Sequence, residues 1–186
     1  MKVYVEREEK EYQEMFLERG WSIADLPHNA DLICFTGGSD VSPSLYGEVN
    51  QGLSSTYPER DLQCVYLYNV AILEGIPCVG ICRGGQFLNV MNGGMMNQHI
   101  EGHTVGRHDL ILPDGRLIEV TSTHHQAIVP NLEEAELVVY APDGQVAEVV
   151  VYEEGDMCFQ PHPEYIGAKE TRDYFFELLE EYIFDD

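Results

Sequence analysis

Apolar residues in this chain gather in short runs that alternate with stretches of helical periodicity. Residues 32–35 and 76–81 are apolar and rich in β-branched side chains, which predicts buried strands. Residues 86–91 continue with the spacing of a helix, and residues 3–5 predict a strand that leads into a helix over about 8–19. This alternation predicts a mostly parallel sheet covered by helices.

The second half of the chain predicts hairpins. Strand-like segments, with Asp-Gly turns between them, occur at residues 109–112, 117–120, 137–140 and 146–152. We expect these segments to form antiparallel hairpins added to the central sheet. Residues 167–184 close the chain as an amphipathic helix, whose apolar stripe consists of Phe175, Leu178, Leu179, Tyr182 and Ile183.

Length and composition favour one compact domain. A chain of 186 residues lies in the single-domain range and can bury a sizeable core. No Pro/Ser-rich linker, internal repeat or low-complexity block interrupts it. We therefore expect residues 1–186 to form a single three-layer α/β domain.

Charge and hydropathy narrow the class of partner. The formal net charge of −23, from 33 acidic and 10 basic residues, argues against binding to nucleic acid or to an anionic membrane. No apolar run approaches the roughly 18 residues of a membrane-spanning helix, and Met1 leads directly into a charged, strand-like segment. Five cysteines without paired spacing favour a reduced, cytoplasmic chain over a disulfide framework.

Residues 80–86, Gly-Ile-Cys-Arg-Gly-Gly-Gln, place a cysteine between glycines where a predicted strand meets a predicted helix. Gly-x-Cys-x-Gly has the form of a nucleophile elbow, in which glycines let the backbone turn tightly enough to expose the nucleophile. Cys82 would lie at a helix N-terminus, where backbone amides and the helix dipole favour its thiolate. The Arg83 amide is placed to donate into an oxyanion hole, and Gln86, one helical turn on, borders the same pocket.

Residues 161–164, Pro-His-Pro-Glu, supply the second part of a candidate catalytic site. They follow strand-like segments at 148–152 and 157–160, and each proline keeps the residue before it extended. Residues two apart in an extended segment point to the same side, so Glu164 can reach the His162 imidazole. That contact would fix the tautomer of His162 and turn its other nitrogen towards the thiol. The alternative is a surface histidine in a proline-rich loop, and the elbow favours catalysis.

The other cysteines and histidines have simpler interpretations. Cys34, Cys78 and Cys158 lie in apolar or strand-like stretches without a following glycine turn, which is typical of buried structural thiols. The remaining candidates for metal ligands are His99, His103, His108, His124 and His125. Their spacings do not match a metal-binding helix and no cysteine pair accompanies them, so we expect no metal site.

Taken together, these residues resemble the class I glutamine amidotransferase superfamily, whose glutaminase domains use a Cys-His-Glu triad. Residues 36–43, Thr-Gly-Gly-Ser-Asp-Val-Ser-Pro, and 46–48, Tyr-Gly-Glu, resemble the γ-glutamyl hydrolase-like branch, the peptidase C26 type, which includes γ-glutamyl-γ-aminobutyrate hydrolases. Arg60-Asp61, His124-His125-Gln126 and residues 141–144 follow in the expected order. The resemblance spans about residues 31–164 and implies a flavodoxin-like α/β fold.

The resemblance implies roles for the matching residues. Cys82 would be the nucleophile, His162 the general base and acid, and Glu164 the residue that orients His162. Backbone amides of Gly38 and Arg83 would hold the oxyanion. The γ-glutamyl group would be bound by Gly37, Gln86, His124, His125 and Gln126. Thiolate attack would release an amine and leave a γ-glutamyl thioester for water to hydrolyse, with no metal or organic cofactor.

Two positions depart from the family pattern, and both bear on substrate specificity. Cys64 stands three residues after Asp61, where the family has a glutamate, and Pro161 replaces the aromatic residue that commonly precedes the catalytic histidine.

Three functions stay open from the sequence. Arg83 and the Asp40-Val41 pair favour a stand-alone hydrolase, whose small-molecule substrate would be glutamine or a γ-glutamyl amide. The short chain and its charge favour a glutaminase subunit that delivers ammonia to a separate synthetase or ligase. A non-enzymatic binding or regulatory relative is the third, and the intact triad disfavours it. The sequence leaves a homodimer open and does not identify the amine.

Overall fold

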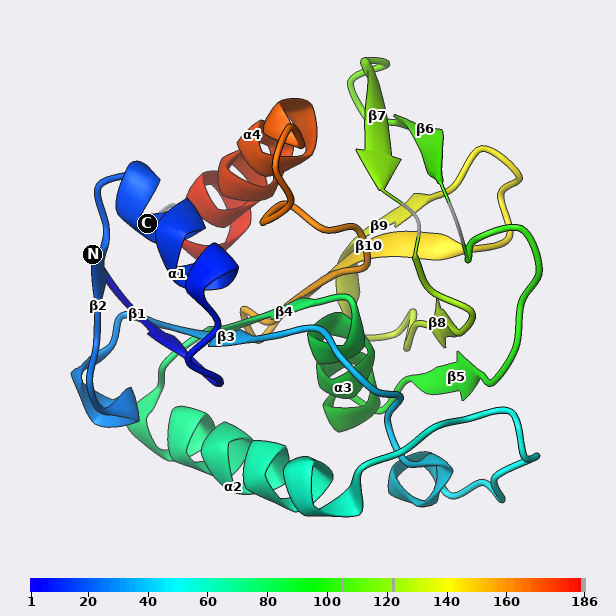
Figure 1. Cartoon of the computed structure of the whole chain (residues 1–186), viewed down its shortest axis with the longest axis horizontal. Helices are drawn as coiled ribbons and strands as arrows, with labels where there is room; N and C mark the ends of the chain where they lie inside the picture. The colour runs from blue at the N-terminus through cyan, green and yellow to red at the C-terminus, as the bar shows by residue number, and fades with distance from the viewer. Residues whose placement is uncertain (105, 122, 185–186) are drawn as a thin grey trace.

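The computed structural model describes residues 1–104, 106–121 and 123–184, which form a nine-stranded sheet with helices on both faces and a separate two-stranded sheet (Figure 1). The larger sheet has the spatial order β2 (Ser22–Ile23), β1 (Lys2–Val5), β3 (Leu32–Phe35), β4 (Cys78–Ile81), β11 (Met157–Phe159), β10 (Ala147–Tyr152), β8 (Ala127–Val129) and β5 (Met95–Asn97), and β9 (Ala135–Tyr140) also pairs with β10. Neighbours from β2 to β11 are parallel, and the pairings beyond β11 are antiparallel. The predicted α/β class, with its parallel core, is confirmed.

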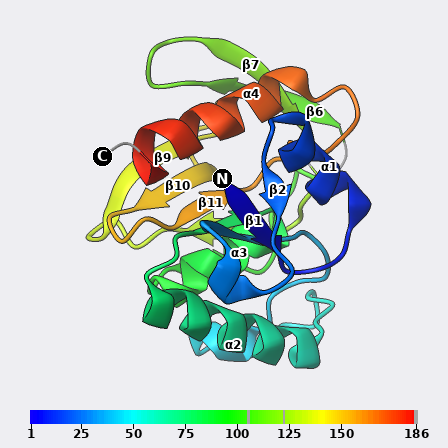
Figure 2. The same ribbon diagram turned by 90° about the vertical axis from the view of Figure 1, so that its left-hand side faces the viewer.

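Two pairs of helices cover the two faces of this sheet. Figure 2 shows α1 (Lys10–Glu18) and α4 (Lys169–Leu178) on one side, with α2 (Pro58–Glu74) and α3 (Arg83–Met91) on the other. Short 3-10 turns at Pro27–Asn29 and Pro43–Tyr46 connect elements on the α2 side of the sheet. No helix in the described part of the chain is long and apolar enough to cross a membrane.

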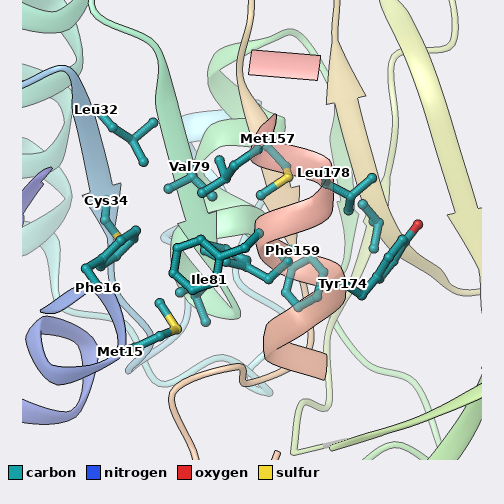
Figure 3. Close-up of a cluster of buried hydrophobic side chains, with 14 of the residues drawn as sticks. Met15, Phe16, Leu32, Cys34, Val79, Ile81, Met157, Phe159, Tyr174 and Leu178 are labelled. Atoms are coloured by element: carbon teal, nitrogen blue, oxygen red, sulfur yellow. The ribbon is translucent and has the colours of Figure 1, made fainter. Parts of the chain in front are cut away.

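Successive residues of β3 point to opposite faces and join different cores, as the period of a strand requires. Leu32 and Cys34 pack with α1 and α4 (Figure 3), while Ile33 and Phe35 pack with α2 and α3. All four side chains are fully buried. A strand buried on both faces is continuously apolar, which explains why residues 32–35 lack the alternation of a half-exposed strand.

The hairpin at β6 (Arg107–Ile111) and β7 (Leu117–Thr121) is not added to the central sheet, and that expectation is wrong. It forms a two-stranded sheet beside α4, where Thr171 Oγ1 donates to the carbonyl of Glu119 at 3.2 Å. Its alternating apolar residues pack into the α1 and α4 core rather than beside another strand. Alternation reveals which face a strand buries but not which element covers it. The other predicted hairpin, β9 with β10, does join the large sheet.

The C-terminal helix is shorter than its sequence pattern. Helix α4 ends at Leu178 and continues as a π-helical turn over Leu179–Ile183. Phe175 and Leu178 are buried, and Tyr182 is partly buried against the same core. The predicted apolar stripe therefore faces the sheet.

Backbones approach closely where β3, β4 and α3 meet, and glycines make this possible. A Cβ added at Gly80 would lie 2.2 Å from the carbonyl carbon of Gly84, and one at Gly84 would lie 2.1 Å from the carbonyl oxygen of Phe35. Real Cβ atoms do not approach backbone this closely, so α3 can begin against the sheet only with glycine at both positions.

We expect Gly84→Ala to lower the free energy of unfolding by about 3 kcal/mol or more, because a rigid backbone atom blocks the new methyl group. Gly115→Ala is the control: Gly115 has a φ of +86° and open space around it, so its cost is only the backbone strain of about 1–2 kcal/mol. Urea unfolding of both variants measures the difference. Equal losses would contradict the close approach as the reason for glycine.

Candidate active site

Cys82 occupies a strained turn between β4 and α3. Its φ of 51° and ψ of −110° make it the one non-glycine residue with positive φ among those the structure describes. Its amide donates to the Phe159 carbonyl at 2.8 Å, and its own carbonyl accepts the Gln86 amide at 3.0 Å in the first turn of α3. Strain of this kind is held in place by surrounding structure and is common at functional sites. The geometry agrees with the predicted elbow.

His162 is held from three sides. Its Nδ1 donates to Glu164 Oε1 at 2.6 Å, and its backbone amide donates to Thr121 Oγ1 at 3.0 Å. The ring stacks on Tyr165 with 4.4 Å between centroids and 12° between planes. With Nδ1 committed to the carboxylate, Nε2 is the nitrogen left for proton transfer.

The charge balance around His162 favours an imidazolium. Burial by itself lowers the pKa of the imidazole, but contacts with the Cys82 sulfur and with Glu164 outweigh burial and raise the pKa well above its ordinary value. Glu164 is nearly fully buried, so its charge acts through little water. Both contacts therefore favour the protonated form of the His162 imidazole.

The Gly37–Gly38 turn lies directly against both residues. A Cβ added at Gly37 would lie 3.4 Å from His162 Cε1 and 3.7 Å from Cys82 Cβ. The Gly37 amide donates to the Tyr12 hydroxyl at 3.0 Å, so Gly38 supplies the amide of this turn that suits an oxyanion. Gly38 has a φ of +137°, which only glycine adopts without strain.

Arg60 supports the turn from behind. Its guanidinium donates to the carbonyls of Gly37 at 2.8 Å and Thr36 at 3.0 Å, and it forms a buried pair with Glu6 at 2.7 Å. Contact with Arg60 and Thr36 outweighs burial and lowers the pKa of the Glu6 carboxyl. Glu6 also accepts from Cys64 Sγ at 3.5 Å. A carboxylate from β1's C-terminal end thus lies beside Cys64, the position at which the family pattern has glutamate.

The Arg83 side chain points away from the reacting atoms. It is almost completely buried, pairs with Asp61 and donates to Cys64 Sγ at 3.1 Å. Asp61 in turn accepts the Ser42 amide at 3.1 Å. Only the backbone amide of Arg83 is therefore available to the site, and its side chain anchors the start of α3 to α2.

A cavity of about 250 Å³ opens beside the sulfur of Cys82. Its walls include three of the predicted substrate-binding residues, Gln86, His124 and His125, together with Gly38, Ser39, Asp40, Ser55 and Thr123. His125 Nε2 lies 3.1 Å from Asp40 Oδ2. The volume and polar lining suit a small, polar, charged substrate group.

Gln126 and Gly37 are placed differently from that set. Gln126 is fully buried and its Nε2 donates to Ser54 Oγ at 2.7 Å, so its side chain braces the 50–56 loop and does not line the cavity. Gly37 lines a second cavity of about 610 Å³ on the His162 side, which is also lined by Glu9, Glu11, Tyr12, Gly38, Glu164, Tyr165 and Ile166.

Several residues that shape the site have no sequence signal of their own. Tyr12 and Glu6 lie in ordinary helix and strand-end contexts, and Thr121 ends a hairpin strand. Their roles arise from contacts across more than 24 residues of sequence. Tyr165 is the one supporting residue that the sequence could have indicated. It directly follows Glu164, and an aromatic ring next to the motif can stack on His162.

The chain is similar to a protein family and to several named proteins. The Peptidase C26 family model matches residues 17–114. The provisionally named glutamine amidotransferase-like protein YvdE of Lactococcus lactis is 32% identical over 157 residues, which cover 72% of this chain and 66% of that protein. The γ-glutamyl-γ-aminobutyrate hydrolase of Escherichia coli O157:H7 is 44% identical over 62 residues, 33% of this chain and 24% of that protein.

Solved structures share the fold. The crystal structure of a protein from Thermoplasma acidophilum, provisionally named as part of a GMP synthase, superposes with a TM-score of 0.68 at 17% identity. The match covers 97% of this chain and 92% of that one. At this identity the likeness concerns the fold.

We expect Glu164→Gln to lower the pKa of His162 by about one unit or more, because the variant removes the charge that stabilises the imidazolium. Titration of the His162 ring nitrogens by NMR measures the shift, and the midpoint should move to lower pH. Glu11→Gln, in the same cavity but without contact to the ring, is the control and should leave the midpoint in place. An unchanged midpoint in Glu164→Gln would contradict the assigned pair.

Proposed function

This chain belongs to the peptidase C26 branch of the class I glutamine amidotransferase-like superfamily, and on that premise we propose that it hydrolyses γ-glutamyl amide bonds with Cys82 as nucleophile. His162 is the general acid and base, and Glu164 orients it. The proposal takes residues 1–186 as one catalytic domain, because both cores are built on the same sheet.

One observation supports this mechanism above the others. The strained elbow at Cys82 and the His162–Glu164 pair both lie against the Gly37–Gly38 turn. Cys82 belongs to the β4–α3 junction, whereas His162 follows β11, the strand paired with β4. Two motifs eighty residues apart therefore meet at the ends of adjacent parallel strands, where ligands bind in such sheets.

In the first half-reaction the Cys82 thiolate attacks the γ-carbonyl carbon and forms a carbon–sulfur bond. The carbonyl oxygen takes the negative charge and accepts hydrogen bonds from the backbone amides of Gly38 and Arg83. His162 then gives its Nε2 proton to the amide nitrogen as the carbon–nitrogen bond breaks. An amine, or ammonia from glutamine, leaves, and the γ-glutamyl group remains on the sulfur as a thioester.

In the second half-reaction the neutral imidazole removes a proton from water, which attacks the thioester. Collapse of the intermediate breaks the carbon–sulfur bond and releases glutamate, whose new carboxyl group gives its remaining proton to solvent. The protonated His162 is left beside the Cys82 thiolate. Glu164 stays ionised throughout and holds Nδ1, so that Nε2 faces the reacting atoms.

We assign the two cavities to different parts of the substrate. The smaller one beside Cys82, with Asp40, Gln86 and His125 in its walls, suits the α-amino and α-carboxylate groups of the γ-glutamyl part. The larger one, on the His162 side, contains the carboxylates of Glu9 and Glu11. Carboxylates in that wall favour a cationic or neutral leaving amine over an acidic one.

A glutaminase subunit is the second candidate, and the T. acidophilum match named as part of a synthase favours it. In that case turnover would be low in the isolated chain and would rise on addition of a synthetase from the native cell. A hydrolase would instead turn over γ-glutamyl amides alone.

We expect Cys82→Ala to reduce release of glutamate from γ-glutamyl amides by about three orders of magnitude or more, because no other group replaces the nucleophile. His162→Ala should be nearly as damaging, whereas Glu164→Gln should keep a larger remnant. Cys78→Ala, which removes a buried thiol from the start of β4, the strand that leads into the elbow, is the matched control. Circular dichroism checks that each variant folds. Activity retained in Cys82→Ala would overturn the mechanism.

The amine preference has its own test. γ-Glutamyl diamines should be hydrolysed with a higher kcat/KM than γ-glutamyl amino acids of equal length, and the double variant of Glu9→Gln and Glu11→Gln should reduce the ratio. A ratio that is unaffected by these substitutions would contradict the assignment of the larger cavity to the amine.

A further inference from the structure

Glu148, near the start of β10, is a fully buried carboxylate surrounded by histidines. Its Oε1 lies 3.1 Å from His108 Nε2, 3.3 Å from His103 Nδ1 and 3.5 Å from His124 Nε2. These residues come from three separate segments: His103 precedes β6, His108 lies within it, and His124 precedes β8. A carboxylate this deep requires positive charge beside it, and among its described neighbours no Lys or Arg supplies one.

The rings are oriented as metal ligands usually are. His124 Nδ1 lies 2.8 Å from the Gln126 carbonyl and His108 Nδ1 lies 3.0 Å from the Asp109 carbonyl, so each ring donates Nδ1–H to backbone. The Nε2 atom of each then presents its lone pair to Glu148. A second hydrogen bond that fixes the outer nitrogen is typical of histidines that bind a metal. The outer nitrogen of His103, Nε2, faces Asp143 Oδ2 at 3.9 Å, which is longer than a hydrogen bond.

The contacts with Glu148 do not form good hydrogen bonds. In the described structure His108 Nε2, His124 Nε2 and both Glu148 oxygens are buried without a hydrogen bond of acceptable geometry. Lone pairs and carboxylate oxygens that converge in this way are satisfied by a proton on an imidazole or by a metal ion between them, and the contact with Glu148 raises the pKa of His108.

The spacing matches a transition metal ion. The ligand atoms of His103, His124 and Glu148 lie within 4.8 Å of one another. Tetrahedral ligands at bonds of about 2.0 Å are separated by about 3.3 Å, which is close to the distances of 3.3 Å from His103 Nδ1 and 3.5 Å from His124 Nε2 to Glu148 Oε1. Imidazole nitrogens with one carboxylate suit Zn²⁺.

We propose that His103, His124 and Glu148 bind a Zn²⁺ ion, and that His108 supports the Glu148 carboxylate through its contact with Oε1. Three protein ligands leave the fourth position of a tetrahedral ion to a water molecule. The ion joins the β5–β6 connection and the segment before β8 to β10. Because His124 and His125 also line the Cys82 cavity, the ion fixes one wall of the candidate active site.

The sequence predicts no metal site, because the spacing of the histidines does not match a metal-binding helix. Spacing along the chain excludes a helical motif, but it does not apply to ligands that separate segments bring together. Glu148 itself had no signal, because it lies in an otherwise apolar strand.

The test uses full-length, tag-free protein that has been stripped of metal with a chelator and titrated with Co²⁺ and then Zn²⁺. We expect one equivalent of Co²⁺ with the absorption of a tetrahedral site, displacement by one equivalent of Zn²⁺, and a higher Tm in the presence of Zn²⁺. Glu148→Gln, which keeps the size of the side chain, and His124→Ala should each weaken binding by more than about tenfold.

Three further variants make the result decisive. His28→Ala removes an exposed histidine far from the cluster and should bind as wild type does. Cys82→Ala should also keep full stoichiometry, which separates this site from metal on the catalytic thiol and from any failure of the hydrolase mechanism. If His124→Ala does not fold, His103→Ala provides the same test. Folded wild type that takes up no Co²⁺, or Glu148→Gln that binds it equally, would overturn the proposal.

Discussion

The close approach of backbone at the β3–β4–α3 junction is the constraint on which the rest of the structure depends. Gly80 and Gly84 allow the first turn of α3 to touch the sheet, and only then can the chain reverse at Cys82 with a positive φ. The β4–β11 pairing brings the segment after β11 to the same edge, so His162 meets the elbow. The nucleophile and its base are thus positioned by sheet geometry rather than by a flexible loop.

Buried ionic contacts hold the parts that the sheet does not. Arg60 and Glu6 fix the turn at Gly37, while Arg83 and Asp61 tie the start of α3 to α2. Buried pairs of this kind add little net stability but penalise any geometry that breaks them, since a lone buried charge is costly. His124 contacts the buried carboxylate of Glu148 and also lines the Cys82 cavity, so this contact constrains a wall of the cavity in the same way.

The sequence predicts those parts of the site whose geometry is determined by neighbouring residues. The elbow follows from glycines around Cys82, and the two prolines of residues 161–164 fix the relation of His162 to Glu164. Contacts between distant segments were not predictable. Glu6 beside Arg60, the hairpin of β6 and β7 packed on α4, and the histidines at Glu148 depend on three-dimensional proximity that no spacing along the chain encodes.

The central claim is that Cys82 attacks the γ-carbonyl carbon of a γ-glutamyl substrate. The most direct measurement is labelling with a diazoketone analogue of glutamine, whose diazomethyl carbon, next to the carbonyl, alkylates a thiolate with loss of N₂ and gives a thioether that water does not cleave. Mass spectrometry of peptides from the labelled protein locates the adduct. The account predicts one label per chain, on Cys82, with loss of activity in proportion and protection by glutamate. Hydrolysis that continues without a label on Cys82, or a label on one of the four other cysteines instead, would contradict it.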